Sequence, residues 1–260
     1  MTEKEVIFDI DNEKIIGHLH LPETRTDSLV IIVHGFTANE IGPGNAHIKL
    51  AESLVQKNIA ALRFNFRYTT PDLKEFEKTT ISGEVKDLET IINKMSEMFS
   101  KIGLVGESMG AVISLMSYDN RIKTIVLWYP PLFMEETGFK RAFTDEAKIE
   151  LETNGYLLQK KRNGQEYKIG KAVIEEIKKI DVAKYAKKVT SPTLILHGEI
   201  DTEVPLSHAE KLLELLKGEK KLVVIRGMEH AFKNKDLQRD LSFLPQLIDP
   251  TVDWFNRWLK

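Results

Sequence analysis

The chain contains no cysteine among its 260 residues. This absence excludes disulfides, thiolate metal sites and a cysteine nucleophile, and it agrees with a reducing compartment. Long apolar runs are missing too: none approaches the length that crosses a bilayer, and the charged opening Met1–Glu5 does not resemble a signal peptide. We therefore expect a soluble, cytoplasmic protein without a membrane partner.

An excess of positive charge is also lacking. The 37 Lys and Arg residues are balanced by 39 Asp and Glu residues, which gives a formal net charge of -2. This balance leaves no basic footprint for nucleic acid, so a small-molecule partner is favoured. The sequence has no metal-ligand cluster and no phosphate-binding glycine loop, and we expect no metal and no cofactor. The sequence leaves open whether the chain forms a homodimer.

What the chain does contain is an alternation of strand-like and helix-like segments. Its length and its 42% apolar residues favour one α/β domain with an insertion over two independent domains. The alternating runs Glu5–Ile10 and Lys14–Leu21 predict an N-terminal hairpin. Further strands are expected at Leu29–Val33, Ile59–Phe64, Ile102–Val105, Thr124–Trp128, Thr193–His197 and Lys221–Ile225.

Helical spacing of apolar residues fills the intervals between these strands. Helices are expected at Ala46–Lys57, at Thr79–Phe99, from Met109 onward, at Ser207–Leu216 and at Pro250–Leu259. Because strand and helix alternate from residue 29 to residue 128, right-handed crossovers and a mostly parallel sheet are predicted.

One segment, residues 131–189, breaks the alternation. We interpret it as an inserted cap subdomain between two parts of a core domain, residues 1–130 and 190–260. Within it, Gly155–Lys161 and Gln165–Ile169 flank Asn163–Gly164, a strong hairpin signal, and Lys171–Ile180 predicts a short helix. A cap would lie over the edge where the parallel strands end. The alternative is a surface insertion without a role.

The clearest motif is Gly106-Glu107-Ser108-Met109-Gly110, which matches G-x-S-x-G. In this nucleophile elbow a serine stands in a strained turn between a strand and a helix, and the glycines avoid collisions with both. Three fixed positions are weak support by themselves. The apolar run before Ser108 and the helical pattern after it supply the strand-turn-helix context that the motif requires. The alternative is a serine that only caps a helix.

Other motifs follow strands in an order that resembles a known fold. They are His34-Gly35-Phe36 after an early strand, His197 to Pro205 (HGEIDTEVP) after a late strand and Gly227-Met228-Glu229-His230 after the last strand. Together with the elbow they resemble the α/β-hydrolase superfamily, within it the bacterial cinnamoyl and feruloyl esterases. The resemblance implies a mostly parallel eight-stranded sheet flanked by helices, with a small inserted cap. It departs from those esterases at Arg67–Pro71, where they carry a Gly-rich turn.

Ester hydrolysis through this motif needs a nucleophile, a base, an acid and an oxyanion hole. We assign Ser108 as the nucleophile and His230 as the general base, with Asp201 orienting the imidazole. Glu199 is the alternative acid. The other histidines fall on strand-end turns, edge strands or helix faces. The backbone N–H groups of Phe36 and Met109 are the expected oxyanion donors.

The substrate is predicted from the insertion. Its mixture of charged residues with scattered aromatics favours soluble short-chain or aryl esters, including hydroxycinnamoyl esters, over emulsified triglycerides. Phe139, Tyr156 and Leu158 are candidates for the pocket wall, unless they only anchor the insertion. Two alternatives remain: a serine peptidase of the prolyl-oligopeptidase type and a non-catalytic scaffold that binds a small ligand. Ser108 excludes dehalogenases and epoxide hydrolases, which need an aspartate at this position.

Overall fold

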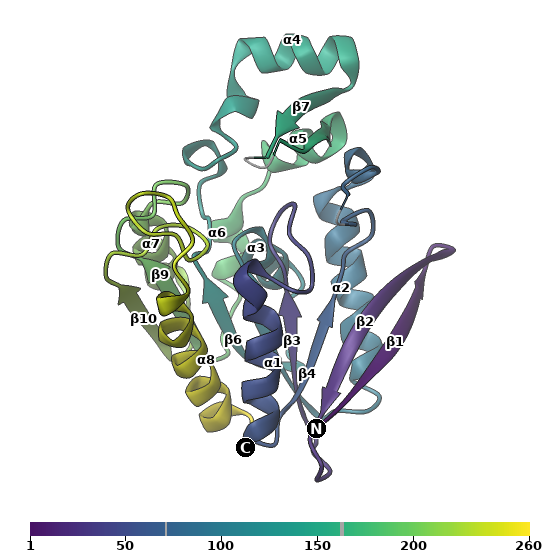
Figure 1. Ribbon diagram of the computed structural model, residues 1–260, viewed down its shortest axis with the longest axis vertical. Helices are drawn as coiled ribbons and strands as arrows, with labels where there is room; N and C mark the ends of the chain where they lie inside the picture. Colours follow the sequence, from purple (N-terminus) through teal and green to yellow (C-terminus); the bar gives the residue numbers. More distant parts are fainter. Residues whose placement is uncertain (71, 162–163) are drawn as a thin grey trace.

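The computed structural model describes residues 1–70, 72–161 and 164–260 and centres on one eight-stranded sheet (Figure 1). The strand order is β1-β2-β4-β3-β5-β6-β9-β10. These strands span β1 Thr2–Ile10, β2 Glu13–Leu21, β3 Ser28–Val33, β4 Ala60–Phe64, β5 Lys101–Glu107, β6 Ile122–Trp128, β9 Thr193–Gly198 and β10 Lys220–Ile225. Each of the eight predicted strands is present.

Only the N-terminal part of the sheet is antiparallel. β1 pairs with β2 as the predicted hairpin, and β2 pairs antiparallel with β4. Asp11 and Asn12 form the tight turn, where both adopt the positive φ that short Asp and Asn side chains tolerate. Every other pairing in the sheet is parallel. The prediction of a mostly parallel sheet is therefore confirmed.

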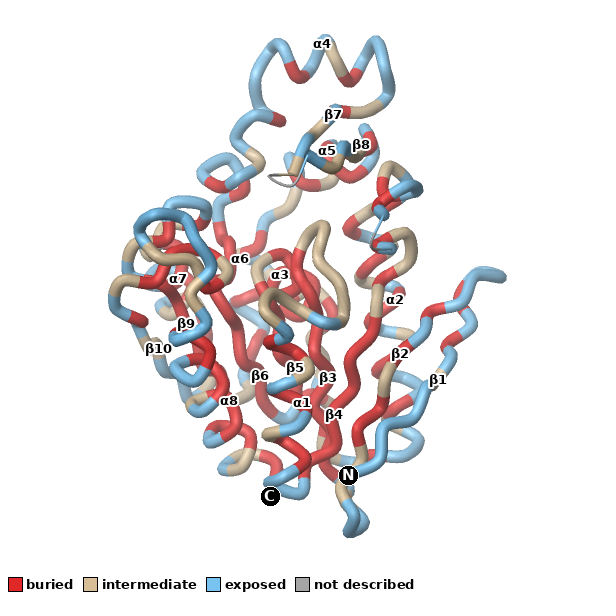
Figure 2. The backbone as a smooth tube through the Cα atoms, viewed as in Figure 1, coloured by how far each residue is buried: buried red, intermediate tan, exposed pale blue. Residues whose placement is uncertain are grey.

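Helices cover both faces of the sheet because its central strands are apolar throughout. β3 and β4 are buried at every position, and Figure 2 shows this buried centre beside an exposed β1–β2 tip. One face packs against α1 (Ala46–Gln56) and α8 (Leu244–Trp258). The opposite face packs against α2 (Ile81–Met95), α3 (Met109–Met116), α6 (Val182–Ala186) and α7 (Leu206–Leu215). The short 3-10 turns outside the insertion are η1 Pro43–Asn45, η2 Phe76–Lys78 and η5 Leu241–Phe243.

The C-terminal helix begins earlier than predicted. The sequence suggests a start at Pro250, but α8 begins at Leu244 with proline in its first turn, and Pro250 lies inside it. An internal proline loses one backbone hydrogen bond and costs about 3 kcal/mol. Buried apolar side chains on both sides of Pro250, among them Leu247 and Phe255, keep the helix continuous. Packing on the sheet therefore outweighs the local preference.

Residues 131–189, which the sequence predicts to be an insertion and which we call the inserted segment, contain a separate two-stranded sheet of β7 (Tyr156–Lys160) and β8 (Glu166–Gly170). The predicted hairpin strands are confirmed by antiparallel pairing from Tyr156↔Gly170 to Lys160↔Glu166. Of the predicted turn, Gly164 has a positive φ of 89°, whereas Asn163 lies outside the described residues. The expected helix is α5 (Lys171–Ile177), which is shorter than predicted. The segment also contains η3 Met134–Glu136 and η4 Lys140–Phe143.

Figure 1 places α4 (Asp145–Asn154), β7 and α5 above the edge of the sheet at which the parallel strands end. The segment is fixed there by packing on η2: a Cβ on Gly170 would lie 2.1 Å from the Glu77 carbonyl oxygen, so only glycine allows this approach. No helix in residues 1–70, 72–161 or 164–260 is long and apolar enough to cross a membrane.

Candidate active site

Ser108 occupies a strained turn between β5 and α3. Its φ is 52° and its ψ is -117°, a backbone conformation that residues other than glycine rarely adopt. A Cβ on Gly106 would lie 2.5 Å from the Ala111 Cα, and one on Gly110 would lie 2.3 Å from the Val33 carbonyl oxygen. The two glycines of the motif therefore let strand and helix approach closely enough to hold Ser108 in this turn.

His230 and Asp201 come from loops that follow neighbouring strands, β10 and β9. The His230 Nδ1 lies 2.8 Å from Asp201 Oδ2. The other carboxylate oxygen of Asp201 accepts hydrogen bonds from the backbone N–H groups of Glu203 at 3.0 Å and Val204 at 2.7 Å. Asp201 is thus fixed on one side by its own loop and contacts the imidazole on the other.

Burial and charge act in opposite directions on this pair. Burial disfavours the charged imidazolium, but the hydrogen bond and the charge of Asp201, with a smaller contribution from Glu203, outweigh it and raise the pKa of His230. Burial likewise opposes the Asp201 carboxylate, while the His230 hydrogen bond and charge hold the pKa of Asp201 below its ordinary value. The arrangement therefore favours an ionised carboxylate next to a histidine that gains a proton readily.

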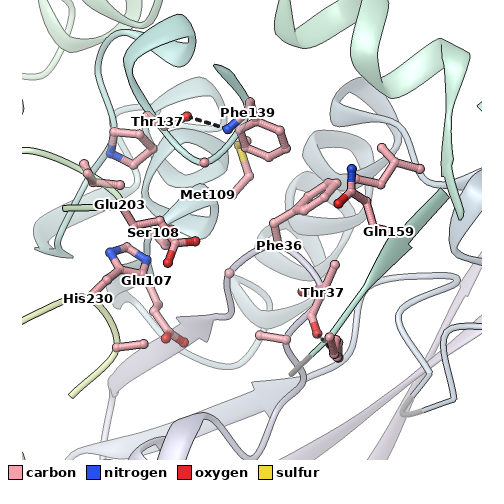
Figure 3. Close-up of a pocket in the computed structure, with 18 of the residues that line it drawn as sticks. Phe36, Thr37, Glu107, Ser108, Met109, Thr137, Phe139, Gln159, Glu203 and His230 are labelled. Atoms are coloured by element: carbon pink, nitrogen blue, oxygen red, sulfur yellow. Dashed lines mark hydrogen bonds between the residues drawn. The ribbon is translucent and has the colours of Figure 1, made fainter. Parts of the chain in front are cut away.

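Ser108 and His230 line the same cavity, together with Gly35, Phe36 and Met109. Figure 3 shows Ser108 beside the His230 ring, on one side of the cavity. The sequence predicted Ser108, His230 and Asp201 as one site, and the structure brings all three together at the carboxyl edge of the sheet.

The predicted oxyanion donors flank Ser108. Neither the Phe36 nor the Met109 backbone N–H hydrogen-bonds another group in the described part of the chain. A Cβ on Gly35 would lie 3.3 Å from the Ser108 Cβ, so the loop that carries Phe36 runs directly past the serine. His34 supports this loop, because its Nε2 accepts a hydrogen bond of 3.2 Å from the Phe66 N–H. Two free donors next to a serine suit a developing oxyanion.

A buried network below the serine was not predicted. Tyr129 donates a 2.7 Å hydrogen bond to Glu107 Oε1, and His47 Nε2 lies 2.9 Å from Glu107 Oε2. The Tyr129 ring also packs edge-on against the His230 ring at a centroid distance of 4.6 Å, and Tyr129 adopts a φ of 39°. One signal for this network is visible in the sequence, a glutamate directly before the nucleophile.

Glu229 is a second residue that sequence reasoning missed. Its Oε1 accepts a 2.9 Å hydrogen bond from the Thr202 N–H, and its Oε2 accepts one of 2.6 Å from the His230 N–H. Glu229 therefore ties the loop of Asp201 to the loop of His230. The alternative acid, Glu199, has a different role, because it accepts a 3.0 Å hydrogen bond from the Gly227 N–H in the turn after β10.

The cavity above Ser108 has a volume of about 570 Å³ and is roofed by the inserted segment. Phe139 lines it as predicted, and its ring packs edge-on against Phe36 at 4.9 Å. Tyr156 and Leu158 do not line it, so this part of the prediction was wrong. Successive side chains of a strand point to opposite faces, and the lining residues of this strand are Leu157 and Gln159.

Tyr156 and Leu158 lie on the other face of β7. Leu158 is 46% exposed, and the Lys168 Nζ lies 4.5 Å above the Tyr156 ring. Of the segment Arg67–Pro71, where the sequence departs from the esterase pattern, the described residues 67–70 do not line the cavity, and Pro71 is outside the described residues. Arg67 Nε donates a 2.7 Å hydrogen bond to Asp87. Across the described ranges, no group of three or more His, Asp and Glu side chains could hold a metal ion.

Comparisons with known proteins agree with this architecture. The chain is 24% identical to the uncharacterized protein YfhR of Escherichia coli O157:H7 over 243 residues, which cover 88% of this chain and 74% of YfhR. It is 24% identical to the esterase EstD of Thermotoga maritima over 246 residues, which cover 85% of this chain and 59% of EstD. The structure of Est1E from Butyrivibrio proteoclasticus with bound ferulic acid superposes with a TM-score of 0.80 at 19% identity, covering 97% of this chain and 98% of Est1E.

The structural likeness shows that the chain has the α/β-hydrolase fold, as the order of its motifs predicts. A family model described as an uncharacterised protein family matches residues 29–245, a range that includes Ser108, Asp201 and His230. Because this range covers most of the 260 residues, the chain belongs to the uncharacterised protein family UPF0227.

Proposed function

We propose that this protein is a serine carboxylic-ester hydrolase that acts on short-chain or aryl esters through an acyl-enzyme. The observation that carries the proposal is Ser108 in its strained turn, on a cavity that it shares with a histidine whose Nδ1 is bonded to a buried aspartate. A serine, an imidazole and a carboxylate in these positions can activate a hydroxyl for attack on a carbonyl.

In the first half of the reaction, Ser108 Oγ forms a bond to the ester carbonyl carbon and its proton passes to His230 Nε2. Asp201 accepts the Nδ1–H hydrogen bond and stabilises the imidazolium. The carbonyl oxygen becomes an oxyanion and accepts hydrogen bonds from the Phe36 and Met109 N–H groups. The intermediate then collapses: the carbon–oxygen bond to the alcohol breaks, and His230 returns the proton to the departing alkoxide.

In the second half, water replaces the alcohol. His230 Nε2 takes a proton from water as the water oxygen bonds to the acyl carbon, and the same two N–H groups hold the second oxyanion. The bond to Ser108 Oγ then breaks, His230 protonates the serine, and the carboxylic acid leaves. Atoms and protons balance over the cycle, which consumes one ester and one water and yields one acid and one alcohol.

The cavity supports a compact substrate. Its volume of about 570 Å³ and a wall of Phe139, Leu157 and Ile169 suit an acyl or aryl group of modest size. EstD carries the name esterase, and Est1E binds ferulic acid, which is an aryl acid. These relatives support an ester substrate, with hydroxycinnamoyl esters as one candidate. We further propose that residues 131–189 act as the cap that selects among esters.

The experiment that tests this proposal is Ser108→Ala with 4-nitrophenyl acetate as substrate. We expect turnover to fall by at least about 10³-fold, because no other group replaces the nucleophile. Ser117→Ala is a matched control: Ser117 ends the same helix α3, and its buried Oγ has no hydrogen-bond partner in the described structure. This control should keep wild-type turnover.

Melting curves of both variants show whether the fold is retained. Turnover that persists in a well-folded Ser108→Ala variant would refute the proposal, as would a wild-type protein that hydrolyses none of a panel of acetyl, butanoyl, feruloyl and coumaroyl esters. The second result would favour a non-catalytic scaffold.

A further inference from the structure

The cavity has a polar end beneath the β7–β8 hairpin. Gln159 and Lys161 both line the cavity, and they point to the same side because residues two apart share a face of an extended strand. The pairing continues past the end of β7, since the Lys161 N–H donates a 2.8 Å hydrogen bond to the Gln165 carbonyl. Backbone pairing therefore holds both side chains in place above the cavity.

Lys161 is a half-buried cation without a carboxylate partner among the described residues. Its Nζ donates one hydrogen bond of 3.2 Å, to the carbonyl of Thr37. Burial lowers the pKa of Lys161, and no neighbouring carboxylate acts on it in the opposite direction. The adjacent Lys160 differs: its side chain is 64% exposed, and its Nζ lies 3.9 Å from Glu166. An ammonium has three donors, so Lys161 keeps two for a ligand.

Two neutral groups at the same end also have donors to offer. The side chains of Thr37 and Gln159 line the cavity, and neither makes a hydrogen bond to another protein group within the described ranges. Figure 3 shows both on the side of Phe36 that faces away from Ser108 and His230. Thr37 and Gln159 thus line the cavity on the side of Phe36 away from the reacting serine, and Lys161 joins them through its hydrogen bond to Thr37.

The carboxylates that line the cavity lie elsewhere. Glu107 is buried below Ser108 in its contacts with Tyr129 and His47. Glu203 lies near His230 in Figure 3, and its Oε2 is 3.6 Å from the Lys233 Nζ. The cations that line the cavity are Arg141, Lys161, Lys233 and Arg239, and of these Arg141 is paired with Glu150 at 2.7 Å. The cavity therefore has a surplus of positive charge, although the whole chain has a formal charge of -2.

We propose that the ester substrate carries a carboxylate, which Lys161, Gln159 and Thr37 bind at the end of the cavity beneath the β7–β8 hairpin. The inference rests on the proposed ester hydrolysis and adds the class of substrate. Charge-assisted hydrogen bonds from an ammonium to a carboxylate are among the stronger polar contacts in proteins. Here the bound anion would also neutralise a cation that the protein leaves unpaired.

The apolar part of the lining limits the shape of such a substrate. Phe139, Leu157 and Ile169 line the cavity with apolar surface. A spacer of several methylenes or an aromatic ring fits this surface and carries the carboxylate away from the ester bond. Hydrolysis then yields a dicarboxylic acid when the carboxylate is on the acyl part, or a hydroxy acid when it is on the alcohol part.

The test compares matched anionic and neutral esters. For the acyl part the pair is mono-4-nitrophenyl adipate and 4-nitrophenyl hexanoate; for the alcohol part it is 4-acetoxybenzoate and its methyl ester. We expect one anionic ester to lose at least about tenfold in kcat/KM in Lys161→Ala, mainly through KM, because a hydrogen bond to a charged group is lost. The neutral partner of that pair should be unaffected. The pair that responds tells which part of the ester carries the anion.

Two further variants control for local damage. Lys160→Ala removes the neighbouring exposed ammonium and should behave as wild type with all four esters. Lys161→Arg keeps a cation and should restore most of the preference for the anionic ester. If the anionic-to-neutral ratio is the same in Lys161→Ala and wild type for both pairs, the inference is wrong, whereas Ser108-dependent hydrolysis of the neutral esters would still support the proposed function. If the wild-type protein neither prefers the anionic esters nor hydrolyses the neutral esters, the inference and the proposed function are both wrong.

Discussion

At the residue scale, the protonation of His230 sets the pH at which this site can work. The imidazole must be neutral to accept the Ser108 proton, so the rate should rise with pH through the pKa of His230. Burial lowers this pKa, but the hydrogen bond and charge of Asp201, together with a smaller charge effect of Glu203, raise it above the ordinary value. We therefore expect the acidic limb of kcat/KM to lie above about pH 6.5, the ordinary value for histidine, followed by a plateau.

Asp201→Asn should change both the rate and this limb. An amide in place of the carboxylate removes the negative charge and presents a donor to Nδ1, which favours the wrong tautomer, so kcat should fall by about 10⁴-fold. Burial of His230 then outweighs the smaller opposing charge effect of Glu203, and the limb should move to lower pH. The measurement is a pH profile of kcat/KM on 4-nitrophenyl acetate.

Glu199→Gln is the control, since Glu199 bonds the Gly227 N–H and not the imidazole. It should keep the wild-type limb and most of the rate. A limb that shifts in Glu199→Gln but stays fixed in Asp201→Asn would reverse the assignment of the acid.

Residues such as Ser108, Asp201 and His230 could be predicted because each lies shortly after the end of a strand in a recognisable local pattern. The parallel sheet then brings the ends of distant strands together, and no side-chain detail is needed. Tyr129 and Glu229 could not be predicted, because their roles depend on which way a loop side chain turns. Tyr129 reaches Glu107 only through a φ of 39° that its sequence does not indicate.

At the element scale, the close approach of α3 to the strand ends holds the serine turn in place. A methyl group on Gly110 would lie 2.3 Å from the Val33 carbonyl oxygen and 2.5 Å from that of His34. Both are backbone atoms, so relief requires a shift of the helix or of the loop that carries Phe36. Either shift would move Ser108 relative to the expected oxyanion donors.

Gly110→Ala should therefore lower the free energy of unfolding by several kcal/mol and reduce turnover in whatever protein still folds. Gly155→Ala is the matched control: this glycine has a φ of 78° at the end of α4, with open space around it. It should cost about 1–2 kcal/mol through backbone strain alone and leave kcat unchanged. Urea denaturation and turnover of both variants check this. Equal losses in the two would contradict the close-packing argument.

Elements with a strong apolar pattern could be predicted, and those held by caps or distant contacts could not. α4 was missed because only Ala147 and Leu151 are buried along it, so its apolar stripe is faint. Its signals were the Thr144 side chain, which accepts a hydrogen bond from the Ala147 N–H, and Gly155 after its end. On β7 the strand was predicted but not its orientation, because apolar residues occur on both faces.

At the scale of the whole molecule, the inserted segment is anchored to the core along α2. The Ser82 hydroxyl of α2 donates a 2.6 Å hydrogen bond to Glu176 Oε1 of α5, and the Ser82 N–H donates one of 3.1 Å to Oε2. Below this junction lies Glu84, whose side chain is buried on α2. Burial, and to a smaller degree the charges of Asp87 and Glu176, raise the pKa of Glu84 to about 8.

This buried carboxyl group should make the stability of the whole chain fall as the pH rises. The folded pKa of Glu84 is about 8 against an ordinary value of 4.5, so between these values the folded state binds more protons than the unfolded state. Stability from this group is complete below the unfolded pKa and is lost as the pH passes through the folded pKa. From about pH 6 to about pH 8 the loss should be about 2 kcal/mol.

Glu84→Gln removes the titrating proton while keeping the size of the side chain. The difference in unfolding free energy between wild type and this variant should therefore change by about 2 kcal/mol from about pH 6 to about pH 8. The change should favour the variant at high pH. Other groups titrate in the same range, but they contribute equally to both proteins and cancel in the difference. Glu89→Gln, an exposed position on the same helix, should give a profile parallel to wild type. Urea denaturation at closely spaced pH values measures all three. Parallel profiles for wild type and Glu84→Gln would mean that Glu84 is already ionised at neutral pH in the folded protein, and that the junction between α2 and the inserted segment tolerates its charge.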